Sequence, residues 1–188
     1  NNQQAIASFD FRDKVRPEAQ SVINMLKLKD LTTLILSGDQ SHAPQKLAAQ
    51  LGIDTVMGGL SPQEKSAYVQ QLQADGAIVI MVGDGVNDAP VLGQSHVSVA
   101  MSSGADLAQT TADAILLGDR LSALVTARQI AIKTQLVIKQ NLKWAFVYNL
   151  SVLPPAALGY IPPWLAAIGM SLSSLFVVLN ALRLKRVN

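Results

Sequence analysis

The chain has 188 residues and a formal net charge of +2 at pH 7, from 15 Lys and Arg against 13 Asp and Glu. This length allows one or two domains, and the small net charge excludes the broad basic field that nucleic-acid-binding proteins use. The absence of cysteine excludes a disulfide framework and a thiolate metal site within the chain. The chain begins Asn1-Asn2-Gln3-Gln4, with neither an initiator Met nor the basic and apolar leader of a signal peptide, so we expect it to be the cut end of something longer.

Strand and helix patterns alternate over the first two thirds of the chain. Short apolar runs predict strands at 5–11, 31–36, 53–57, 77–82, 96–101 and 114–117. Helical patterns between them begin at Pro17 and cover 44–51, 61–74 and 105–111. The third helix has a strong start, because Ser61 and Glu64 form a capping-box pattern around Pro62. This alternation predicts a doubly wound α/β sheet with right-handed crossovers.

A long helical pattern follows from Leu121 through Trp144 without a proline or glycine to break it. No formal charge then occurs between Lys143 and Arg183, which leaves room for two apolar helices at 144–158 and 164–182. Lysines precede this stretch and basic residues follow it, so the positive-inside rule predicts that both of its ends are cytoplasmic. A buried helical hairpin of a soluble protein is the alternative, and the charge-free spans disfavour it.

These patterns divide the chain into three expected parts. Residues 1–120 form the α/β domain, residues 121–143 form a linking helix, and residues 144–188 form a transmembrane helical hairpin with a short cytoplasmic tail.

The run from Met81 to Pro90 places carboxylates and an amide in a turn directly after an apolar strand. Gly83 and Gly85 allow the backbone to turn sharply at the carboxyl end of that strand, where open α/β sheets bind their ligands. The carboxylates of Asp84 and Asp88 suit a Mg²⁺ ion that is shared with a phosphate. The alternative is a plain loop in which Asp88 only caps the next helix.

Three further motifs lie near strand ends or helix starts. Ser37-Gly38-Asp39 offers a hydroxyl and backbone N–H groups to a phosphate, and Lys65 offers a cation near a helix start. Asp13 and Arg16 place a carboxylate beside a guanidinium. Each motif alone has an ordinary alternative: a turn, a solvated surface lysine and a capping salt bridge. Their order along the chain is more specific than any one of them.

In this order, and followed by an apolar hairpin, the motifs resemble those of the P-type cation-transporting ATPases, whose phosphorylation domain has a haloacid dehalogenase-like fold. The resemblance covers nearly the whole chain. It implies that Ser37 stands where the family usually has Thr and hydrogen-bonds the phosphoryl group, while Gly38 and Asp39 complete the motif. It also implies that Lys65 neutralises phosphoryl oxygens and that Asp84 is the principal Mg²⁺ ligand.

The same resemblance implies roles for four more residues. Asn87 and Asp88 would position the phosphorylated side chain and the metal, and Asp13 and Arg16 would lie near the nucleotide and the domain hinge. The family's nucleophile is an aspartate in an Asp-Lys-Thr-Gly-Thr motif, and this motif does not occur in the chain. We therefore expect the carboxyl-terminal segment of a pump, inactive by itself, with a sheet that lacks its central strand and keeps unpaired edges.

Polar residues in the two apolar spans indicate which ion is carried. Tyr148 and Asn149 lie in the first span, and Met170 and Ser174 share one helix face in the second. A thioether is a soft ligand that favours Cu(I). From composition alone an alternative is equally favoured, in which Met170 fills a gap and the serines allow close helix packing. The pattern resembles the copper-transporting branch of the family, and residues 156–170 resemble its subgroup linked to cytochrome oxidase assembly.

The resemblance thus implies ATP-driven export of Cu(I) through an aspartyl-phosphate, with ATP and Mg²⁺ as cofactors. Its implied partners are the lipid bilayer, the rest of the same pump and a copper chaperone, with no nucleic acid. The implied location is a bacterial inner membrane, with the phosphorylation domain and the carboxyl terminus in the cytoplasm. Two alternatives remain: a membrane-anchored phosphatase of the same fold, and a non-catalytic membrane fragment. The phosphatase would need its own nucleophile, and Asp10 and Asp13 lack the flanking Thr and Gly pattern.

Overall fold

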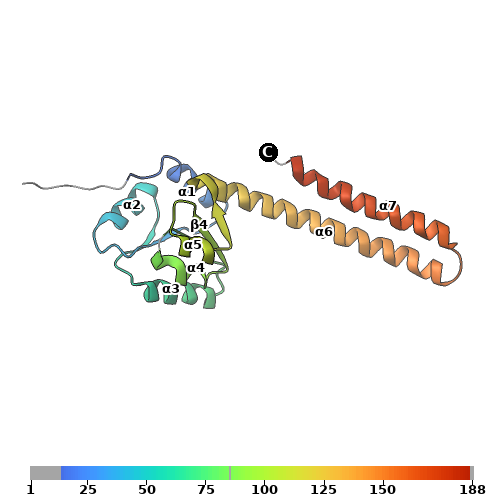
Figure 1. The fold of residues 1–188 in the computed structure, drawn as a ribbon, viewed down its shortest axis with the longest axis horizontal. Helices are drawn as coiled ribbons and strands as arrows, with labels where there is room; N and C mark the ends of the chain where they lie inside the picture. Colours follow the sequence, from blue (N-terminus) through green and yellow to red (C-terminus); the bar gives the residue numbers. More distant parts are fainter. Residues whose placement is uncertain (1–13, 85, 187–188) are drawn as a thin grey trace, which may run out of the picture. The chain divides into compact units, whose positions relative to one another are not determined.

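The computed structural model describes residues 14–84 and 86–186, and the chain divides into two compact units, Asn1–Val125 and Thr126–Asn188. The first unit alternates helices and strands in the expected order (Figure 1). Its elements are α1 (Ala19–Lys27), β1 (Leu34–Leu36), α2 (Ala43–Leu51), β2 (Thr55–Met57), α3 (Pro62–Ala74), β3 (Ile80–Gly83), η1 (Val86–Asp88), α4 (Ala89–Leu92), β4 (Val97–Met101), α5 (Asp106–Thr111), β5 (Ala114–Leu116) and η2 (Leu117–Asp119).

All described strand pairs are parallel, which confirms the α/β class. β1 pairs with β2 in one sheet, and β3, β4 and β5 pair in that order in a second sheet. Within the described ranges, β1 and β3 therefore each keep one unpaired edge. The lack of a central strand stays a prediction.

The strands are shorter than the apolar runs that predicted them. The run at 31–36 contributes only Leu34–Leu36 to a ladder, and the run at 53–57 contributes only Thr55–Met57. These two segments pair with each other over three residues, so residues outside that register have no ladder to join. The predicted strand at 5–11 lies outside the described residues.

The helix ends follow the local sequence signals. α3 begins with the expected capping box, in which the Ser61 side chain accepts from the Glu64 backbone N–H and the Glu64 carboxylate accepts from the Ser61 backbone N–H. α2 ends at Gly52, which adopts a φ of 67° that glycine tolerates without cost.

Two apolar clusters lie in the core that the described residues of the first unit form. One lies between α1, α2 and the residues before β2 and contains Ala19, Ala48, Leu51 and Ile53. The other contains Val99, Met101 and Leu116 from β4 and β5. Leu121 packs against both clusters, so the residue that precedes α6 (Ser122–Ala157) is part of the core of this unit.

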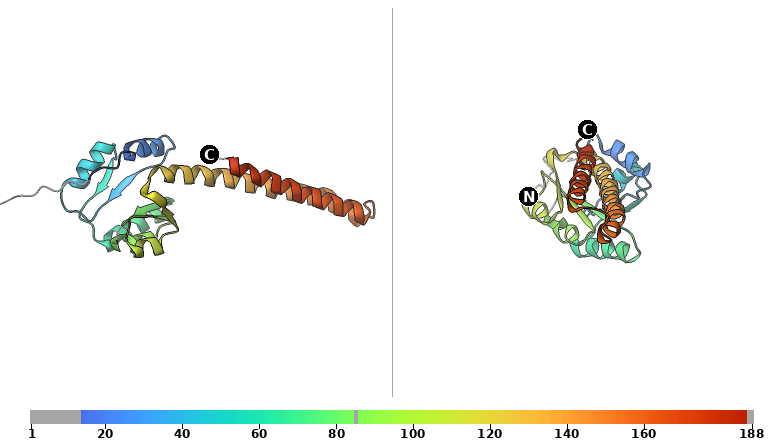
Figure 2. Two further views of the ribbon diagram at one scale, coloured as in Figure 1. Left: turned by 45° about the horizontal axis from the view of Figure 1, so that its top comes forward. Right: turned by 90° about the vertical axis from the view of Figure 1, so that its right-hand side faces the viewer.

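The second unit is an antiparallel pair of helices, the later part of α6 and α7 (Pro163–Leu182), followed by η3 (Arg183–Arg186). The two helices lie side by side in Figure 1 and Figure 2. A turn with Gly159 at a φ of 80° connects them. The seam of α7 consists of half-buried residues spaced three or four apart: Ala166, Gly169, Ser173, Val177 and Asn180.

One helix among the described residues, Pro163–Lys185, is long and apolar enough to cross a membrane. The expectation of two membrane helices is therefore met for α7 only. The predicted first span is the end of a single 36-residue helix, α6, whose earlier turns carry Arg128 and several lysines. Its apolar part runs only from Trp144 to Ala157 and contains two prolines, so a second span stays a prediction.

Candidate functional site

A buried ion pair lies at the end of β3. Lys65 Nζ, from the first turn of α3, donates to Asp88 Oδ1 at 2.8 Å, and the two side chains are only 9% and 15% exposed. A charge this far from water is costly unless it is paired, so removing either partner would leave the other charge buried and unpaired. The ordinary reading of Lys65 as a solvated surface residue is wrong.

Asp88 does not cap the helix that follows it. Although Asp88 occupies the N-cap position of α4, its side chain makes no capping hydrogen bond. The carboxylate instead lies over Gly83, where an added Cβ would be 2.9 Å from Asp88 Cβ and 3.2 Å from Oδ2. Gly83 is therefore needed as glycine, because any side chain would push Asp88 away from the end of β3.

Asp84 directly follows β3 and is exposed. Its backbone is held by the loop after β4: Asp84 O accepts from the Ala105 N–H at 2.8 Å. Gly104 approaches so closely that an added Cβ would be 2.7 Å from Asp84 O and 3.1 Å from its Cα. Sequence reasoning missed Gly104, and the signal for it is the Gly within the Ser102–Ala105 turn after a buried strand. Asn87 lies in η1 and is exposed.

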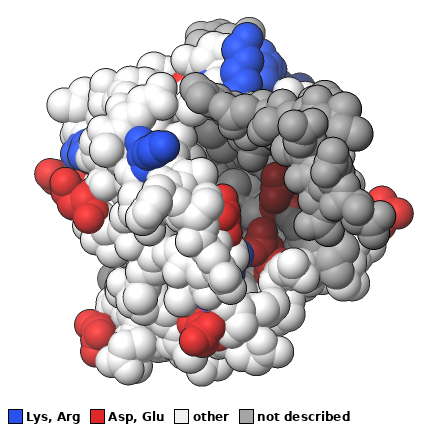
Figure 3. Space-filling model, turned by 90° about the vertical axis from the view of Figure 1, so that its left-hand side faces the viewer, with Lys and Arg blue, Asp and Glu red and all other residues white. Residues whose placement is uncertain are grey.

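The donor set at this end of β3 fits Mg²⁺. No group of three or more His, Cys, Asp and Glu side chains gathers among residues 14–84 and 86–186. Mg²⁺ needs no such cage, because it keeps several waters and takes one or two carboxylates together with phosphate oxygens. Asp84 and Asp88 can supply those carboxylates. Figure 3 shows acidic side chains (red) at several places on one face of the molecule.

Ser37, Gly38 and Asp39 follow β1. Ser37 Oγ accepts from the Asp39 N–H at 3.1 Å, and the Asp39 carboxylate accepts from the Ser41 N–H at 2.7 Å. The bond from the Ser41 backbone lowers the pKa of Asp39. These contacts form a turn, which was the alternative to a phosphate-binding role for this motif. The described contacts of the motif do not include Lys65, Asp84 or Asp88. A phosphate-binding role for Ser37 stays a prediction.

Arg16 connects the two ends of the first unit. Arg16 Nη1 donates to the backbone carbonyl of Asp119 at 3.1 Å, although 103 residues separate them. Asp13, its expected neighbour, lies outside the described residues. The contact places Arg16 beside η2, just before α6, and its expected roles near the nucleotide and the domain hinge stay predictions.

Asp119 was not singled out from the sequence, yet it joins several elements. It follows Gly118 and adopts a φ of 55°. Its Oδ1 accepts from the Ser103 N–H at 2.9 Å and from Ser102 Oγ at 3.0 Å, in the same loop that holds Asp84. The only sequence signal was the Gly-Asp pair, which favours a left-handed turn but does not identify its partner 16 residues away.

The hydrogen bond from the Ser103 backbone lowers the pKa of Asp119, and the Arg16 charge lowers it further. An aspartate with a lowered pKa stabilises the fold above its ordinary pKa of about 3.9, and this stabilisation is lost as the pH falls through the folded-state value.

We therefore expect Asp119→Asn, which keeps the shape but cannot ionise, to make the chain less sensitive to acid below about pH 4. Thermal unfolding of both forms from about pH 3 to 7 measures this, with Asp54→Asn as an exposed control. An acid dependence identical to that of the unaltered chain would contradict it.

The four residues expected to carry the ion differ in their placement on the hairpin. Tyr148 is half-buried, and its hydroxyl lies where a Cβ on Gly169 would be 2.6 Å away, so Tyr148 packs into the seam. Asn149 and Ser174 are exposed, and Met170 is 66% exposed. Asn149, Met170 and Ser174 are thus open to other partners on the hairpin, and an ion path lined by the four residues stays a prediction.

Comparison with protein families matches residues 2–96 to the haloacid dehalogenase-like hydrolases. A probable cation-transporting ATPase of Haemophilus influenzae is 42% identical over 99% of the chain, and a copper-exporting P-type ATPase of Staphylococcus haemolyticus is 41% identical over 93%. The chain spans only 26% and 22% of the lengths of these two relatives.

Solved structures agree with these relatives. A zinc-transporting PIB-type ATPase in its E2.Pi state superposes with a TM-score of 0.88 at 35% identity, over 93% of this chain and 29% of that one. The catalytic domain of the CPx-ATPase CopB-B superposes with a TM-score of 0.59 at 38% identity, over 65% of this chain and 49% of that one.

Proposed function

Because the chain belongs to the haloacid dehalogenase-like hydrolase family, we propose that it is the carboxyl-terminal part of an ATP-driven heavy-metal pump that works through an aspartyl-phosphate. The observation that carries this proposal is the buried Lys65–Asp88 pair beside Asp84, at the end of a parallel strand. Its relatives are cation-transporting P-type ATPases, which supports the same reading. In this proposal residues 1–120 are the end of the phosphorylation domain, 121–143 the linking helix and 144–188 the membrane hairpin.

The proposed chemistry is phosphoryl transfer, in which the protein mainly positions groups and balances charge. Lys65 would neutralise the phosphoryl oxygens and, through its bond to Asp88, keep that carboxylate in place. Asp84 and Asp88 would hold Mg²⁺, and Asn87 would orient the phosphorylated side chain. Bound Mg²⁺ would supply charge stabilisation to the phosphoryl group.

The nucleophile would come from a strand that the described sheets leave room for. The unpaired edges of β1 and β3 can each accept one parallel neighbour. A strand between them would end beside Ser37 and Asp84, because parallel strands share one carboxyl edge. This placement would let Ser37, Gly38 and Asp39 contact the phosphoryl group from the side opposite Lys65.

For the transported ion we propose Cu(I). Met170 supplies a soft thioether on an exposed face of α7, where other helices of the pump can complete a site. Several relatives are named copper-exporting ATPases, while the superposed PIB-type structure transports zinc, so relatives alone do not decide between the ions. The proposed orientation, with both ends of the hairpin in the cytoplasm, rests on the basic residues that flank it.

Replacing Met170 by Leu tests the ion directly. Leu keeps the volume and the apolar character of the side chain but removes the sulfur. If Met170 binds Cu(I), the affinity for Cu(I) in the full-length pump should fall by about tenfold or more. If Met170 only packs, the affinity should not change.

The measurement is Cu(I) stoichiometry together with ATPase activity stimulated by Cu(I), Zn²⁺ or Co²⁺. Met170 is the only methionine in the sequence of α7, so Leu172→Met added to Met170→Leu is the control for position. It returns one thioether to the same helix on a different face, and it should not restore binding. Unaltered Cu(I) binding in Met170→Leu would reject Met170 as a copper ligand. If none of the metal ions stimulated the ATPase activity of the unaltered protein, the proposed pump function would be rejected.

A further inference from the structure

The two units of the chain carry opposite charge. Every Asp and Glu lies at or before Asp119, whereas residues 126–188 contain seven basic residues and no acidic one. The basic residues are Arg128, Lys133, Lys139, Lys143, Arg183, Lys185 and Arg186. They lie on both sides of an apolar helical hairpin, which is the arrangement that favours contact with anionic lipid headgroups.

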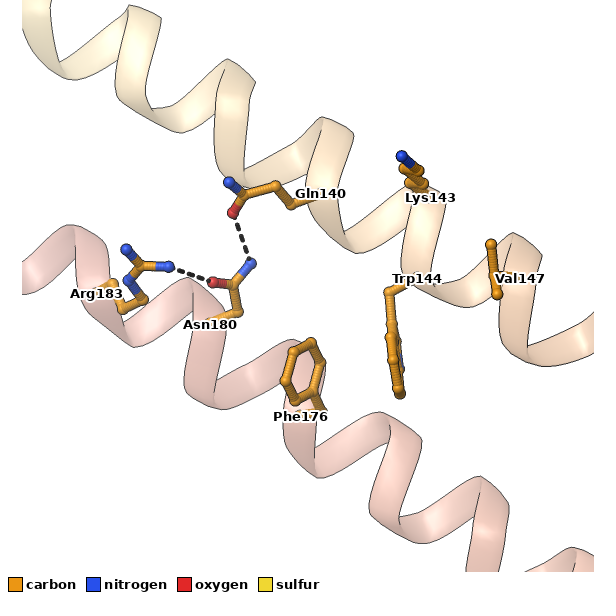
Figure 4. Close-up of a pocket in the computed structure, with 7 residues that line it drawn as sticks. All are labelled: Gln140, Lys143, Trp144, Val147, Phe176, Asn180 and Arg183. Carbon is orange, nitrogen blue, oxygen red and sulfur yellow. Dashed lines mark hydrogen bonds between the residues drawn. The ribbon is translucent and has the colours of Figure 1, made fainter.

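Two of these cations, Lys143 and Arg183, line one pocket of about 380 Å³ between α6 and the end of α7 (Figure 4). The pocket lies where the basic flanks meet the apolar parts of both helices. Its lining is Gln140, Lys143, Trp144, Val147, Phe176, Asn180 and Arg183.

A network of amides orients the guanidinium at this pocket. Asn180 Nδ2 donates to Asn141 Oδ1 at 2.9 Å and to Gln140 Oε1 at 3.2 Å, which joins the two helices. Arg183 Nη1 donates to Asn180 Oδ1 at 3.2 Å. This bond uses one of the five N–H groups of the guanidinium, and the planar fork of such a group suits two phosphate oxygens.

The other side of the pocket is apolar and is held in place by α7. Trp144 Nε1 donates to Ser173 Oγ at 3.1 Å, so the indole is fixed across the seam. The ring centroids of Trp144 and Phe176 are 4.6 Å apart. A ligand in this pocket would meet Arg183 at one end and aromatic surface at the other, with Lys143 beside Trp144 on α6 (Figure 4).

We propose that this pocket binds the headgroup phosphate of an anionic phospholipid, with Lys143 and Arg183 as its charge partners and the glycerol and upper acyl groups against Trp144 and Val147. A phospholipid would contact both the cations and the aromatic side chains of the pocket, whereas free phosphate would contact only the cations. From the proposed function, this proposal takes only the membrane location of the hairpin. It does not depend on metal transport.

The test compares lipids that stay bound to the chain in detergent micelles, counted by native mass spectrometry. The probes are phosphatidylglycerol, which is anionic, and phosphatidylcholine, which is zwitterionic. The pocket variant is Lys143→Gln with Arg183→Gln. The matched control is Lys139→Gln with Lys185→Gln, which removes the same charge from exposed positions outside the pocket.

We expect the pocket variant to bind phosphatidylglycerol about tenfold more weakly or worse, since two charge-assisted bonds are lost, and the control to stay within about twofold. Phosphatidylcholine should bind both alike. Asn180→Ala, which keeps both charges, should weaken phosphatidylglycerol binding by less than the pocket variant. Equal losses in the two double variants would mean diffuse attraction to the basic flanks and would overturn the proposal.

Two further measurements distinguish a bound lipid from a free anion and from another helix of the pump. A third keeps the test of the lipid site apart from the test of the proposed pump function. Displacement of the lipid by millimolar inorganic phosphate would overturn the proposal in favour of a free anion. In the full-length pump, phosphatidylglycerol binding should also fall in Lys143→Gln with Arg183→Gln. Unchanged binding in this double variant would show that another helix fills the pocket, and would also overturn the proposal. Metal-stimulated ATPase activity of the unaltered pump is measured separately, so a failure of the pump function is not mistaken for a failure of the lipid site.

Discussion

Replacing Asp84 by Ala in the full-length pump should reduce Mg²⁺-dependent formation of the phosphoenzyme by about 10³-fold or more. Asp84 is exposed, and the contacts that the structure describes for it are made by its backbone. The packing of the unit does not depend on its carboxylate, so the variant should fold and enter the membrane normally.

The measurement is labelling of the pump with radioactive ATP over a range of Mg²⁺ concentrations, together with its thermal unfolding. Asp54→Ala is the matched control, because Asp54 is an exposed aspartate between α2 and β2, away from the end of β3. The control should label like the unaltered pump. Normal phosphoenzyme turnover in Asp84→Ala would reject Asp84 as a metal ligand.

The second large effect is expected from a single methyl group at Gly104. A Cβ there would be 2.7 Å from Asp84 O and 2.9 Å from Met101 O, and both are backbone atoms that cannot rotate aside. The loop must shift, so Gly104→Ala should destabilise the first unit by about 1–3 kcal/mol. The shift also moves the backbone of Asp84, so the Mg²⁺ concentration needed for phosphorylation should rise.

Gly93→Ala is the control for this prediction. Gly93 has helical dihedral angles, and an added Cβ would be 3.4 Å from the Thr111 Cγ2 methyl group, which is ordinary contact. Its stability should stay within about 0.5 kcal/mol of the unaltered chain. Thermal unfolding and the Mg²⁺ titration measure both variants, and a Gly104→Ala protein with unchanged stability would show that the loop does not hold Asp84.

Local sequence signals were sufficient for the order of elements and for part of the site. The capping box at Ser61 and Glu64 determines where α3 begins, and this start places Lys65 within reach of Asp88. The glycine at position 83 indicated a sharp turn, and the structure adds that Asp88 lies over it. These features depend on neighbours a few residues apart, which is the range over which periodicity and turn chemistry are informative.

What could not be predicted depends on distant partners. The length of β1 is limited by its register with β2, which no pattern within 31–36 reveals. Asp119 gains its role from Ser102, Ser103 and Arg16, and the last of these is 103 residues away. The extent of the membrane spans could not be predicted either. α6 continues without interruption from a polar to an apolar sequence, and no local signal marks the boundary.

The packing of Leu121 against both apolar clusters has a consequence for the order of folding. A chain that emerges from the ribosome can pair β1 with β2 early, since these strands are near neighbours in sequence. The two halves of the first unit can join through this leucine only when residue 121 has been made, after nearly all of the unit. Docking of the halves through Leu121 thus comes after the synthesis of nearly the whole unit, so the core of this unit is completed late.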